Sequence, residues 1–496
     1  MSISFKTSEP ALCNIRRMNA TTSQTLSAPH PVTSSPRGPA SRWWGLPLLR
    51  AMRADYLGFT SSLHRDHGDI TFMRLFNECA YDLFTPELVR EALVDHADSV
   101  IRWERGIEVF AQVFGQSVLV TEGGTWQRQR RMLQAAFTPR KVAGYADLMV
   151  SAATRALDAA LPVSSSQAAQ RVDMDALFST LTMDVILRTL FGASARADTA
   201  QASAAVQTLS AGAMREMFQP FTWPDWLPLP GKAAKRQALK CLRDLVGSHI
   251  ASHQAQADGK EGDDLLSMLL ALRDESTGSA LSDFEVFDQC MVSFQAGHET
   301  SATALLWWSR LMAEHPQAAA RAQAEVDTLL EGRAPQAADA AALPWLTATL
   351  KEAMRLYPPV AAVMTRRTTA PITLGGHAVA KGALLRITPW VIQRDPRWFD
   401  TPDAFRPERF MPDAPPPPRG AWMPFGAGSR VCLGQHFAML EMTLVAALLL
   451  QRCTLALPSD SLPADPVLNV TLRPRHGLHL MLSLRAACLT EALPVA

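Results

Sequence analysis

Long hydrophobic runs, paired cysteine motifs, internal repeats and a strong charge of either sign are all missing from this 496-residue sequence. No stretch approaches the ~18 consecutive apolar residues that a transmembrane helix needs, so we expect no transmembrane anchor. The run from Met442 to Leu450 is apolar but too short, and it predicts a core helix. The formal net charge of +1 argues against a nucleic-acid partner, because proteins that bind nucleic acids carry a basic excess.

Cysteine pairs at C-x-x-C spacing are also absent. An odd, dispersed set of cysteines predicts reduced thiols in a cytoplasmic protein, and it argues against a disulfide framework and a cysteine-rich zinc site. His298 and Glu299 begin the zinc motif H-E-x-x-H, but the last position is Ala302, which excludes that site. The seven cysteines are Cys13, Cys79, Cys241, Cys290, Cys432, Cys453 and Cys488.

The composition, with 48% hydrophobic and 19% charged residues, is that of a globular protein with a large core. A chain of this length would ordinarily form about three domains. No linker interrupts its middle, however, so we predict one large domain at 37–488. A disordered N-terminal tail is expected at 1–36, and a C-terminal tail at 489–496.

The first 36 residues are rich in Ser, Thr, Pro and Ala and contain one acidic residue, Glu9. Together with Arg16 and Arg17, this composition is similar to that of a transit peptide. A disordered tail, or a true start at Met18 instead of the first methionine, is the favoured interpretation. The segment Trp43–Leu49 either touches a membrane surface or packs where the chain enters the fold, and we expect it to pack.

Hydrophobic periodicity predicts a mainly helical fold with small β-sheets near both ends of the chain. Almost all signals between about Trp126 and Leu350 are helical. Gly375 and Gly376 predict a tight turn between two strands. Strands are expected at Asp69–Leu75, Ala80–Phe84, Thr369–Leu374, His377–Val379, Ala383–Thr388, Asn469–Leu472 and Leu478–Leu484.

The clearest predicted helix begins after Ser282, which forms a capping box with Glu285 three residues later. Its pattern continues to about Glu314, where His315 and Pro316 end it. About 32 residues at ~1.5 Å each give a length of roughly 48 Å. We therefore expect this helix to cross the whole domain.

One cysteine lies at the end of a glycine-punctuated segment, Phe-Gly-Ala-Gly-Ser-Arg-Val-Cys-Leu-Gly, at residues 425–434. Gly426 and Gly428 permit tight backbone turns, and Gly434 permits close approach to a flat, bulky group. The apolar helix predicted from about Gln435 would direct free N–H groups and its positive dipole end at the cysteine sulfur, which favours the thiolate. This arrangement suits a metal ligand.

The segment resembles the cysteine-ligand loop of the cytochrome P450 family, F-x-x-G-x-R-x-C-x-G, and matches every fixed position. The resemblance covers roughly residues 36–484 and implies one large domain with haem b between the long helix and this loop. It also implies that Cys432 binds the iron and favours O–O cleavage. Phe425, Arg430 and Gly434 would contact the cofactor. The implied activity is that of a monooxygenase, which inserts one oxygen atom from O2 into a hydrophobic substrate.

The middle of the long helix carries Gly297, Glu299 and Thr300. Glycine costs about 1 kcal/mol relative to alanine inside a helix, and close approach of a ligand is one reason to retain it. We expect Thr300 to turn its hydroxyl to the carbonyl four residues earlier. The segment is similar to the family's A-G-x-D/E-T motif, which implies that Gly297 lies at the haem. The motif also implies that Thr300 and Glu299 assist protonation of bound dioxygen.

Two further segments, E-x-x-R at 352–355 and P-E-R-F at 407–410, are similar to segments of the same family. Glu352 and Arg355 lie on one helical face because they are three residues apart. The resemblance implies a buried network of Glu352, Arg355 and Arg409 behind the cysteine loop. Removing one partner of such a network typically costs about 3–5 kcal/mol, so we expect a structural role that is needed for haem retention.

Trp126 and Arg130 are four residues apart on one predicted helical face and resemble the family's W-x-x-x-R motif. The resemblance implies that both bind a haem propionate, for which the guanidinium fork is well suited. Arg430 would bind the same propionates. Arg366 is a further candidate at the family's spacing, although the adjacent Arg367 is the alternative.

Arg128 and Arg131, on the same predicted helix, form either a solvated basic face or a docking surface for an acidic electron-transfer protein. The chain after Cys432 is too short for a fused reductase. We therefore expect electrons from NAD(P)H to arrive through a ferredoxin and its reductase, or another separate reductase, and we expect a monomer. Two alternatives are a peroxide-driven peroxygenase or isomerase on the same scaffold, and a non-enzymatic protein that binds haem or apolar ligands.

The substrate pocket is expected to be apolar, without a charged group placed to bind a substrate carboxylate. Fatty acids, terpenoids and aromatic molecules all suit such a pocket. Several of the predicted lining residues could equally be core contacts between helices. The predicted lining is the loop Ile101–Leu119, the stretch Met214–Leu229, Val292, Phe294 and Ala296 on the long helix, the run Val360–Met364, and Asn469–Val470.

Overall fold

A computed structural model describes residues 36–161, 169–192, 199–219, 221–256, 264–275, 277–362 and 364–485. The predictions for residues 1–35, for the alternative start at Met18, for Cys13 and Cys488 and for the C-terminal tail lie outside these residues. Positions 220 and 363 of the predicted pocket lining also lie outside them.

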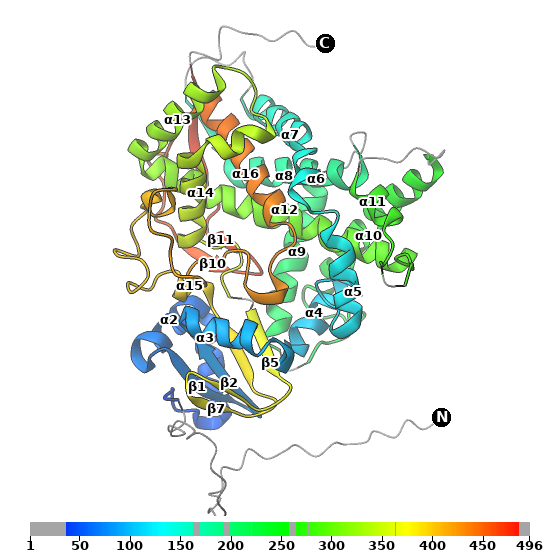
Figure 1. The fold of residues 1–496 in the computed structure, drawn as a ribbon, viewed down its shortest axis with the longest axis vertical. Coiled ribbons are helices and arrows are strands. Elements are labelled where there is room, and N and C mark those ends of the chain that lie inside the picture. Colours follow the sequence, from blue (N-terminus) through cyan, green and yellow to red (C-terminus); the bar gives the residue numbers. More distant parts are fainter. Residues whose placement is uncertain are drawn as a thin grey trace, which may run out of the picture.

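Helices make up most of the described chain, as predicted. Figure 1 shows them gathered at one end of the molecule, with the largest sheet and helices α2 and α3 at the other end. The α-helices are α1 (Leu46–Ala54), α2 (Tyr56–His67), α3 (Pro86–Arg90), α4 (Glu104–Phe114), α5 (Gly123–Gln134), α6 (Pro139–Ala143), α7 (Ala146–Ala160), α8 (Met174–Phe191), α9 (Thr199–Met217), α10 (Lys232–Gln256), α11 (Leu265–Ala271), α12 (Asp283–Glu314), α13 (Pro316–Leu330), α14 (Pro344–Leu356), α15 (Pro389–Ile392) and α16 (Gln435–Arg452).

The strands are short and lie toward the two ends of the chain. They are β1 (Ile70–Leu75), β2 (Glu78–Leu83), β3 (Val100–Arg102), β4 (Gln170–Asp173), β5 (Met364–Thr368), β6 (Ile372–Leu374), β7 (His377–Val379), β8 (Leu384–Ile387), β9 (Cys453–Ala456), β10 (Pro466–Leu468), β11 (Leu472–Pro474) and β12 (His479–Leu484).

The predicted long helix is α12, which runs for 32 residues. Its N-terminus has the predicted capping box, because Glu285 N–H donates to Ser282 Oγ and Ser282 N–H donates to the Glu285 carboxylate. His315 follows the helix as its C-cap. The prediction of the start, length and end of this helix is confirmed.

The largest sheet has the strand order β1-β2-β8-β5-β3. Strands β2 and β8 pair in parallel, and the other neighbours pair antiparallel. Strand β3 therefore lies beside β5, and the register places Arg102 opposite Arg366. The sheet thus brings together two arginines that are far apart in the sequence.

Several strand predictions need correction. The segment predicted to be a strand from Thr369 forms β6 only from Ile372, and β5 just before it has no counterpart in the prediction. Its sequence, Met-Thr-Arg-Arg-Thr, hides the strand because two adjacent charged residues mask the alternation of buried and half-buried positions. The turn at Gly375 and Gly376 is confirmed: both residues have positive φ, and β6 and β7 pair around them.

Two segments of the predicted pocket have a different local structure. The segment predicted to be a loop, Ile101–Leu119, contains strand β3 and helix α4. Asn469 and Val470 were expected to begin a strand, but they lie in the turn between β10 and β11. Strand β4 was not expected, and it pairs with β12.

Two large groups of buried apolar side chains fill the helical region, and α12 belongs to both. Its N-terminal half, with Cys290 and Phe294, packs with side chains of α4, α8, α9, α10 and α11. Its C-terminal half, with Leu305 and Trp308, packs with side chains of α7, α13, α14 and α16. Because the two groups share α12, the middle of this helix is held from both sides.

The expectation that Trp43–Leu49 packs into the fold is wrong for the two tryptophans. Their side chains are exposed, with relative accessibilities of 82% for Trp43 and 75% for Trp44. Leu48 does pack, against a small core group that includes Leu63 and Phe84. The inner face of α1 therefore fixes the segment, and the tryptophans before it point into solvent.

Candidate functional site: a cysteine loop facing the centre of helix α12

The cysteine loop is closed by a backbone hydrogen bond in which Cys432 N–H donates to Phe425 O over 2.9 Å. Gly426 and Gly428 have φ values of 80° and 71°, which residues with a side chain adopt only with strain. A Cβ on Gly428 would also collide with the backbone oxygen of Leu93. The predicted need for glycine at these two positions is therefore explained.

The cysteine sulfur is accessible from one side, although protein surrounds it on the others. Burial raises the pKa of the Cys432 thiol, and the Gly434 N–H and Arg130 only partly offset this effect. The Gly434 N–H at the start of the following helix thus favours the thiolate, as expected, but burial outweighs this effect in the chain alone. A bound metal cation would supply the missing positive charge, because a coordinating thiol is deprotonated.

Gly434 leaves space beside the sulfur. A Cβ added to this residue would contact only the Cys432 sulfur, at 4.0 Å. Its φ is −84°, so the backbone conformation itself does not require glycine. The predicted reason, room for a flat group, agrees with this geometry. The ring of Phe425 packs edge-on against Trp422, with centroids 6.2 Å apart.

Most of helix α12 is buried, but its middle contains residues that are accessible to solvent. Ala296 is exposed and Thr300 is half-buried, whereas Val292 and Ala302 on either side are buried. Thr300 donates its hydroxyl to Ala296 O over 2.7 Å, as predicted for the position four residues earlier. The hydroxyl oxygen of Thr300 thus lies at an accessible point within an otherwise buried helix.

Gly297 lies at a close contact between two helices, which the sequence did not predict. A Cβ on this residue would lie 2.7 Å from Cδ1 of Ile186, which belongs to α8. Close packing of α8 on α12 therefore requires the glycine, and the predicted reason, close approach of a ligand, stays a prediction. Thr182 reinforces the same contact by donating its hydroxyl to His298 O over 3.1 Å.

Glu299 is buried and fully engaged by residues outside its own helix. Its carboxylate accepts hydrogen bonds from Ser210 Oγ at 2.6 Å and from Thr471 Oγ1 at 2.7 Å. Arg473 lies 3.8 Å away and also binds Asp175 at the surface end of α8. Glu299 therefore joins α12 to α9 and to the turn before β11, beside the accessible Thr300.

Three arginines, one of them buried and two half-buried, lie near the cysteine loop, and the two half-buried ones share one carboxylate. Arg102 donates to Glu122 at 2.8 Å, and Arg430 donates to the same carboxylate at 2.5 Å. Burial, together with Arg102, lowers the pKa of Arg366 to about 10. Burial, Arg102 and Arg366 lower the pKa of Arg430 to about 9. The group has an excess of positive charge and therefore suits an anionic ligand.

The structure distinguishes the adjacent arginines of β5. Arg367 is bound to two carboxylates, Glu78 at 2.7 Å and Glu104 at 2.6 Å. Arg366 points the other way, lies opposite Arg102 and donates to its neighbouring carbonyl, Thr365 O. Of the two predicted alternatives, Arg366 has the inward position.

Arg130 and Trp126 lie on α5 beside the loop but make different contacts. Arg130 donates to Val431 O over 2.7 Å and thereby holds the residue before the cysteine. Its Nε atom is buried and has no hydrogen-bond partner among the described residues. The guanidinium of Arg430 stacks on the ring of Trp126, with its carbon 3.8 Å from the ring centroid.

The neighbouring basic residues of α5 are paired. Arg128 forms an ion pair with Glu285 at the start of α12. Arg131 forms an ion pair with the buried Asp274 over 2.5 Å. Both arginines thus have carboxylate partners within the fold, although the Arg131 side chain is 50% accessible. The two interpretations, a solvated basic face and a docking surface, stay predictions.

The predicted network behind the loop is confirmed as a set of contacts. Arg355 and Glu352 are both fully buried and form a bidentate ion pair with distances of 2.7 and 2.8 Å. Arg409 reaches the same carboxylate over 3.4 Å. Arg355 also donates to Gln393 O, and the Gln393 side chain accepts from Met423 N–H at 2.8 Å. This last step connects the network to the start of the cysteine loop.

Arg102 and Gln393 were missed by the sequence analysis. Arg102 was expected only as one of many pocket-lining positions, and its partner Arg366 is recognisable only from the β3–β5 register. Gln393 binds backbone groups 38 and 39 positions earlier, which no local pattern indicates.

The predicted pocket segments are partly brought together. Val109 on α4, Met217 at the end of α9 and Val470 in the β10–β11 turn pack in one apolar group. Thr471, which follows Val470, binds Glu299, so this group adjoins the centre of α12. Val292 and Phe294 instead belong to the buried core, so they are not part of an open lining.

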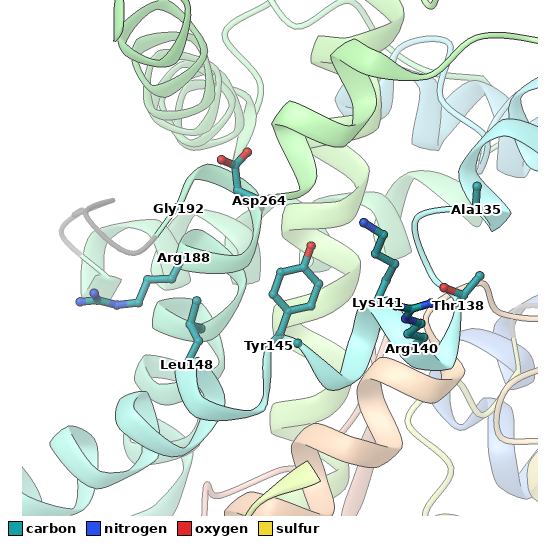
Figure 2. A pocket seen from close by; sticks show the side chains of 10 residues that line it. Ala135, Thr138, Arg140, Lys141, Tyr145, Leu148, Arg188, Gly192 and Asp264 are labelled. Atoms are coloured by element: carbon teal, nitrogen blue, oxygen red, sulfur yellow. The ribbon is translucent and has the colours of Figure 1, made fainter. Parts of the chain in front are cut away.

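A separate surface hollow of about 780 Å³ lies between α6, α7 and the end of α8. Figure 2 shows Lys141 and Tyr145 extending into it from the α6–α7 segment. Its lining includes no residue predicted for the functional site. Two of its lining residues, Gly192 and Asp264, are next in sequence to segments outside the described ranges, so we assign the hollow no function.

The arrangement of donors defines the class of protein. A thiol with open space beside it can bind a metal, and the buried guanidinium groups can bind carboxylates at the edge of a flat ligand. Leu433, next to the cysteine, packs against the apolar group that includes Val292 and Phe294 of α12, and the accessible residues of this helix, Ala296 and Thr300, follow directly. These residues fit haem, so fold and site define a helical haem-thiolate protein.

The chain belongs to the cytochrome P450 family, whose model, described as Cytochrome P450, matches residues 36–481. It is 34% identical to cyclooctatin synthase of Streptomyces melanosporofaciens over 453 residues, which cover 88% of this chain and 96% of that protein. It is also 34% identical to cyclooctat-9-en-7-ol 5-monooxygenase of the same organism, over 80% of this chain and 84% of that protein. Identity to pentalenene oxygenase of Streptomyces avermitilis is 31%, over 86% and 93% of the two chains.

Family membership gives the class of activity. The chain is an oxidoreductase that uses haem-thiolate chemistry and O2 to oxygenate a hydrophobic substrate, with electrons supplied by separate proteins. Within the described residues, no helix combines the length and apolar character needed to cross a bilayer.

Proposed function

We propose that the chain oxygenates a cyclic, largely hydrocarbon terpenoid. The observation that carries this proposal is the apolar group formed by Val109, Ala213, Met217 and Val470 next to the centre of α12. An apolar lining favours a ligand that is largely hydrocarbon. Two relatives carry names that specify cyclooctat-9-en-7-ol and pentalenene, which supports a cyclic substrate.

Haem, when bound, supplies the oxygen chemistry, and the chain supplies binding and orientation. In this proposal Cys432 provides the thiolate ligand, and Arg366 and Arg430 bind the propionates together with Arg102. Arg130 adds positive charge beside the sulfur. Trp126, Phe425 and Gly434 form the remaining contacts, and Gly297 supports the site through the packing of α8 on α12.

Thr300 and Glu299 have separate tasks in this proposal. The hydroxyl of Thr300, held by Ala296 O, offers a hydrogen-bonding oxygen at the open face of α12. Glu299 can exchange protons with neighbouring hydroxyl groups, because Ser210 and Thr471 both contact its carboxylate. Arg473 and Asp175 extend this polar path toward the protein surface.

Electrons are proposed to come from NAD(P)H through a ferredoxin and its reductase, with the protein acting as a monomer in the cytoplasm. The scattered cysteines support a reducing compartment. The domain limits 37 and 488 stay predictions.

The proposal is tested by titrating the purified ferric protein with cyclic terpene hydrocarbons, fatty acids and aromatic compounds. Binding of a substrate beside the haem would change its absorption spectrum directly, and we expect the strongest response from the terpenes. Products formed under labelled dioxygen should contain one oxygen atom from O2. A protein that binds and oxidises fatty acids but ignores terpenes would overturn the proposal.

The iron ligand and the electron source are tested separately. Cys432→His should remove the carbon-monoxide difference band typical of a haem-thiolate, and retention of this band would contradict the assignment. Turnover with ferredoxin, reductase and nicotinamide cofactor should exceed turnover with hydrogen peroxide alone. The opposite result would favour the peroxygenase alternative, and haem binding without any turnover would favour the non-enzymatic one.

A further inference from the structure

The N-terminal end of the described chain carries a cluster of exposed aromatic side chains. Trp43 and Trp44 have relative accessibilities of 82% and 75%, and Phe76 and Leu46 have 43% and 39%. Single exposed apolar residues are common on protein surfaces, but contiguous sets of large ones indicate contact with another surface.

These residues come from two segments that are fixed side by side. Phe76, in the turn between β1 and β2, donates its N–H to Trp44 O over 2.7 Å. Arg74 donates its N–H to Ser41 Oγ over 2.9 Å. A Cβ on Gly45 would lie 2.5 Å from Arg74 O, so the two backbones are in close contact.

The tryptophans are held outward by the backbone. Both adopt positive φ, 52° for Trp43 and 56° for Trp44, a region that costs free energy for bulky residues. The helix that follows, α1, buries Met52 and packs Leu48 against the core. Its opposite face presents Leu46 and the exposed Arg50.

Basic residues dominate the same segment. Residues 36–54 contain Arg37, Arg42, Arg50 and Arg53 and no acidic residue. No described carboxylate lies within 4.0 Å of these four guanidinium groups. The nearest acidic residue in sequence, Asp55, uses its carboxylate to cap α2. Since the whole chain has a net charge of only +1, positive charge is concentrated here.

We propose that this tryptophan–arginine face binds the surface of an anionic lipid bilayer. The face is defined by Arg42, Trp43, Trp44, Leu46, Arg50, Arg53, Arg74 and Phe76. Tryptophan favours the headgroup region, where its ring is buried and its N–H remains hydrated. Each arginine near an anionic membrane surface contributes about 1 kcal/mol, and peripheral binding usually needs both apolar and electrostatic contributions.

The shape of the molecule supports a bilayer over a second protein with a groove. Figure 1 shows the N-terminal segment at the outer end of the molecule, on the side of the five-stranded sheet away from the helices. A projecting end can rest on a flat surface. None of the described helices can span a bilayer, so the contact is peripheral.

The face also lies near the route that we expect for an apolar substrate. Tyr56, at the start of α2, contacts Phe218 at the end of α9, with ring centroids 6.2 Å apart. A terpenoid dissolved in the membrane would therefore lie close to the apolar group around Met217. This benefit depends on the proposed function, whereas membrane binding itself does not.

The test is co-sedimentation of the full-length, haem-loaded protein with vesicles. Phosphatidylcholine vesicles that contain phosphatidylglycerol should bind the protein, and binding should weaken with added salt, whereas pure phosphatidylcholine vesicles should bind it poorly. Trp43→Asn/Trp44→Asn and Arg50→Glu/Arg53→Glu should each weaken binding at least about tenfold. Asparagine is chosen because it tolerates positive φ.

Two matched controls keep the result specific. Phe284→Ala removes another exposed aromatic ring, which is 86% accessible, at the start of α12. Arg140→Glu/Lys141→Glu makes the same change in net charge on α6, next to the hollow in Figure 2. Both controls should bind vesicles within about twofold of the unchanged protein.

Three results would overturn the proposal. One is failure of the unchanged protein to bind anionic vesicles. Another is equal loss of binding in the α6 control, because binding would then follow net charge alone. The third is a dimer that the tryptophan substitutions dissociate, without vesicle binding, since the face would then bind a second copy of the chain. The carbon-monoxide spectrum of each variant checks its folding, and Trp43→Gly/Trp44→Gly replaces the asparagine variant if that one fails.

Discussion

Two adjacent arginines on β5 show how a one-residue step along a strand changes the environment of a side chain. Successive side chains point to opposite faces of a sheet. Arg367 therefore reaches Glu78 and Glu104, while Arg366 joins the inward group with Arg102 and Arg430. The two residues have the same chemistry, but only the inward one is left with an excess of neighbouring positive charge.

Substitution should separate the two arginines. Arg366→Leu is expected to accelerate haem loss at least about tenfold, because it removes one cation that we propose binds the propionates. The measurement is the rate of haem transfer from the protein to an apomyoglobin acceptor. Arg367→Leu is the control: it removes partly exposed ion pairs worth about 1 kcal/mol and should leave the haem-transfer rate within about twofold. The reverse pattern would assign the propionate to Arg367.

A second residue-scale prediction concerns Glu441, which α16 buries completely. Burial raises its pKa to about 8, and the Ser301 hydroxyl offsets this only in part. The folded protein therefore retains this proton at pH values where the unfolded chain, with an ordinary glutamate pKa, has lost it. Stability should fall as pH rises from about 4.5 to about 8.

Glu441→Gln should remove this loss. At pH 9 the variant is expected to be more stable than the unchanged protein by roughly 3–5 kcal/mol, with a much smaller difference near pH 5. Denaturant unfolding at the two pH values measures both differences. An equal effect of the substitution at both would contradict a titrating Glu441.

At the scale of elements, the contact between α8 and α12 depends on one missing side chain. Gly297→Ala should gain about 1 kcal/mol in helix propensity. It also forces the new Cβ against Ile186, 2.7 Å away, and overpacking typically costs about 1–3 kcal/mol. We expect a net loss of stability, measured by guanidinium unfolding.

The double variant identifies the cause. Ile186→Val removes the atom nearest to the new Cβ, so it should cost less in the Gly297→Ala background than alone. A coupling free energy of at least about 0.5 kcal/mol is expected. Additive effects would show that the glycine is retained for another reason.

Elements with strong local signals could be predicted from the sequence. Helix α12 has a capping box, a long apolar pattern and a proline after its end, and its limits were predicted correctly. Strand β5 was missed because its middle is Arg-Arg, and the helix in Ile101–Leu119 was missed because the segment was assigned from its position in the family. Local pattern predicts an element only where neighbouring residues, not distant partners, determine its structure.

The candidate site likewise contains residues that local motifs predict and residues that depend on distant partners. Thr300, Glu352 and Arg355 stand in compact motifs, and the structure gives each of them the partner expected of its motif. Cys432 stands in a motif of the same kind, and its role as a metal ligand stays a prediction. The packing role of Gly297 was missed because its neighbour on α8 is more than a hundred positions away. Arg102 was missed because its role depends on the pairing of β3 with β5.

For the whole molecule, pH dependence combines groups that act in opposite directions. Burial and Arg473 lower the pKa of His298 to about 3, so the folded protein binds less of this proton than the unfolded chain between about pH 3 and 6.5. The Arg397 side chain lowers the pKa of Asp69. Burial opposes the effect of Lys232 and Lys235 on Glu216, but the net result is again a lowered pKa.

We therefore predict acid sensitivity for the whole fold. Stability should decrease as pH falls below about 6.5 through His298, and more steeply below about 4 as the paired carboxylates are protonated. Unfolding free energies should be measured from pH 3 to 7 in the Glu441→Gln variant. This variant lacks the opposing effect of Glu441, so its pH profile reports the acid-induced loss of stability alone. A flat profile over that range would contradict the predicted contribution of His298.

The position of α12 between two separate groups of core side chains has a consequence for how such a protein can change over generations. Substitutions in the group around Cys290 and Phe294 affect the half of the helix that faces α4 and α9, where the substrate is expected. The group around Leu305 and Trp308 supports α14 and α16, which flank the cysteine loop. Substitutions at distant sites contribute nearly additively to stability. Substitutions that change the substrate can therefore accumulate in the group around Cys290 and Phe294, while the group around Leu305 and Trp308 keeps the cysteine loop in place.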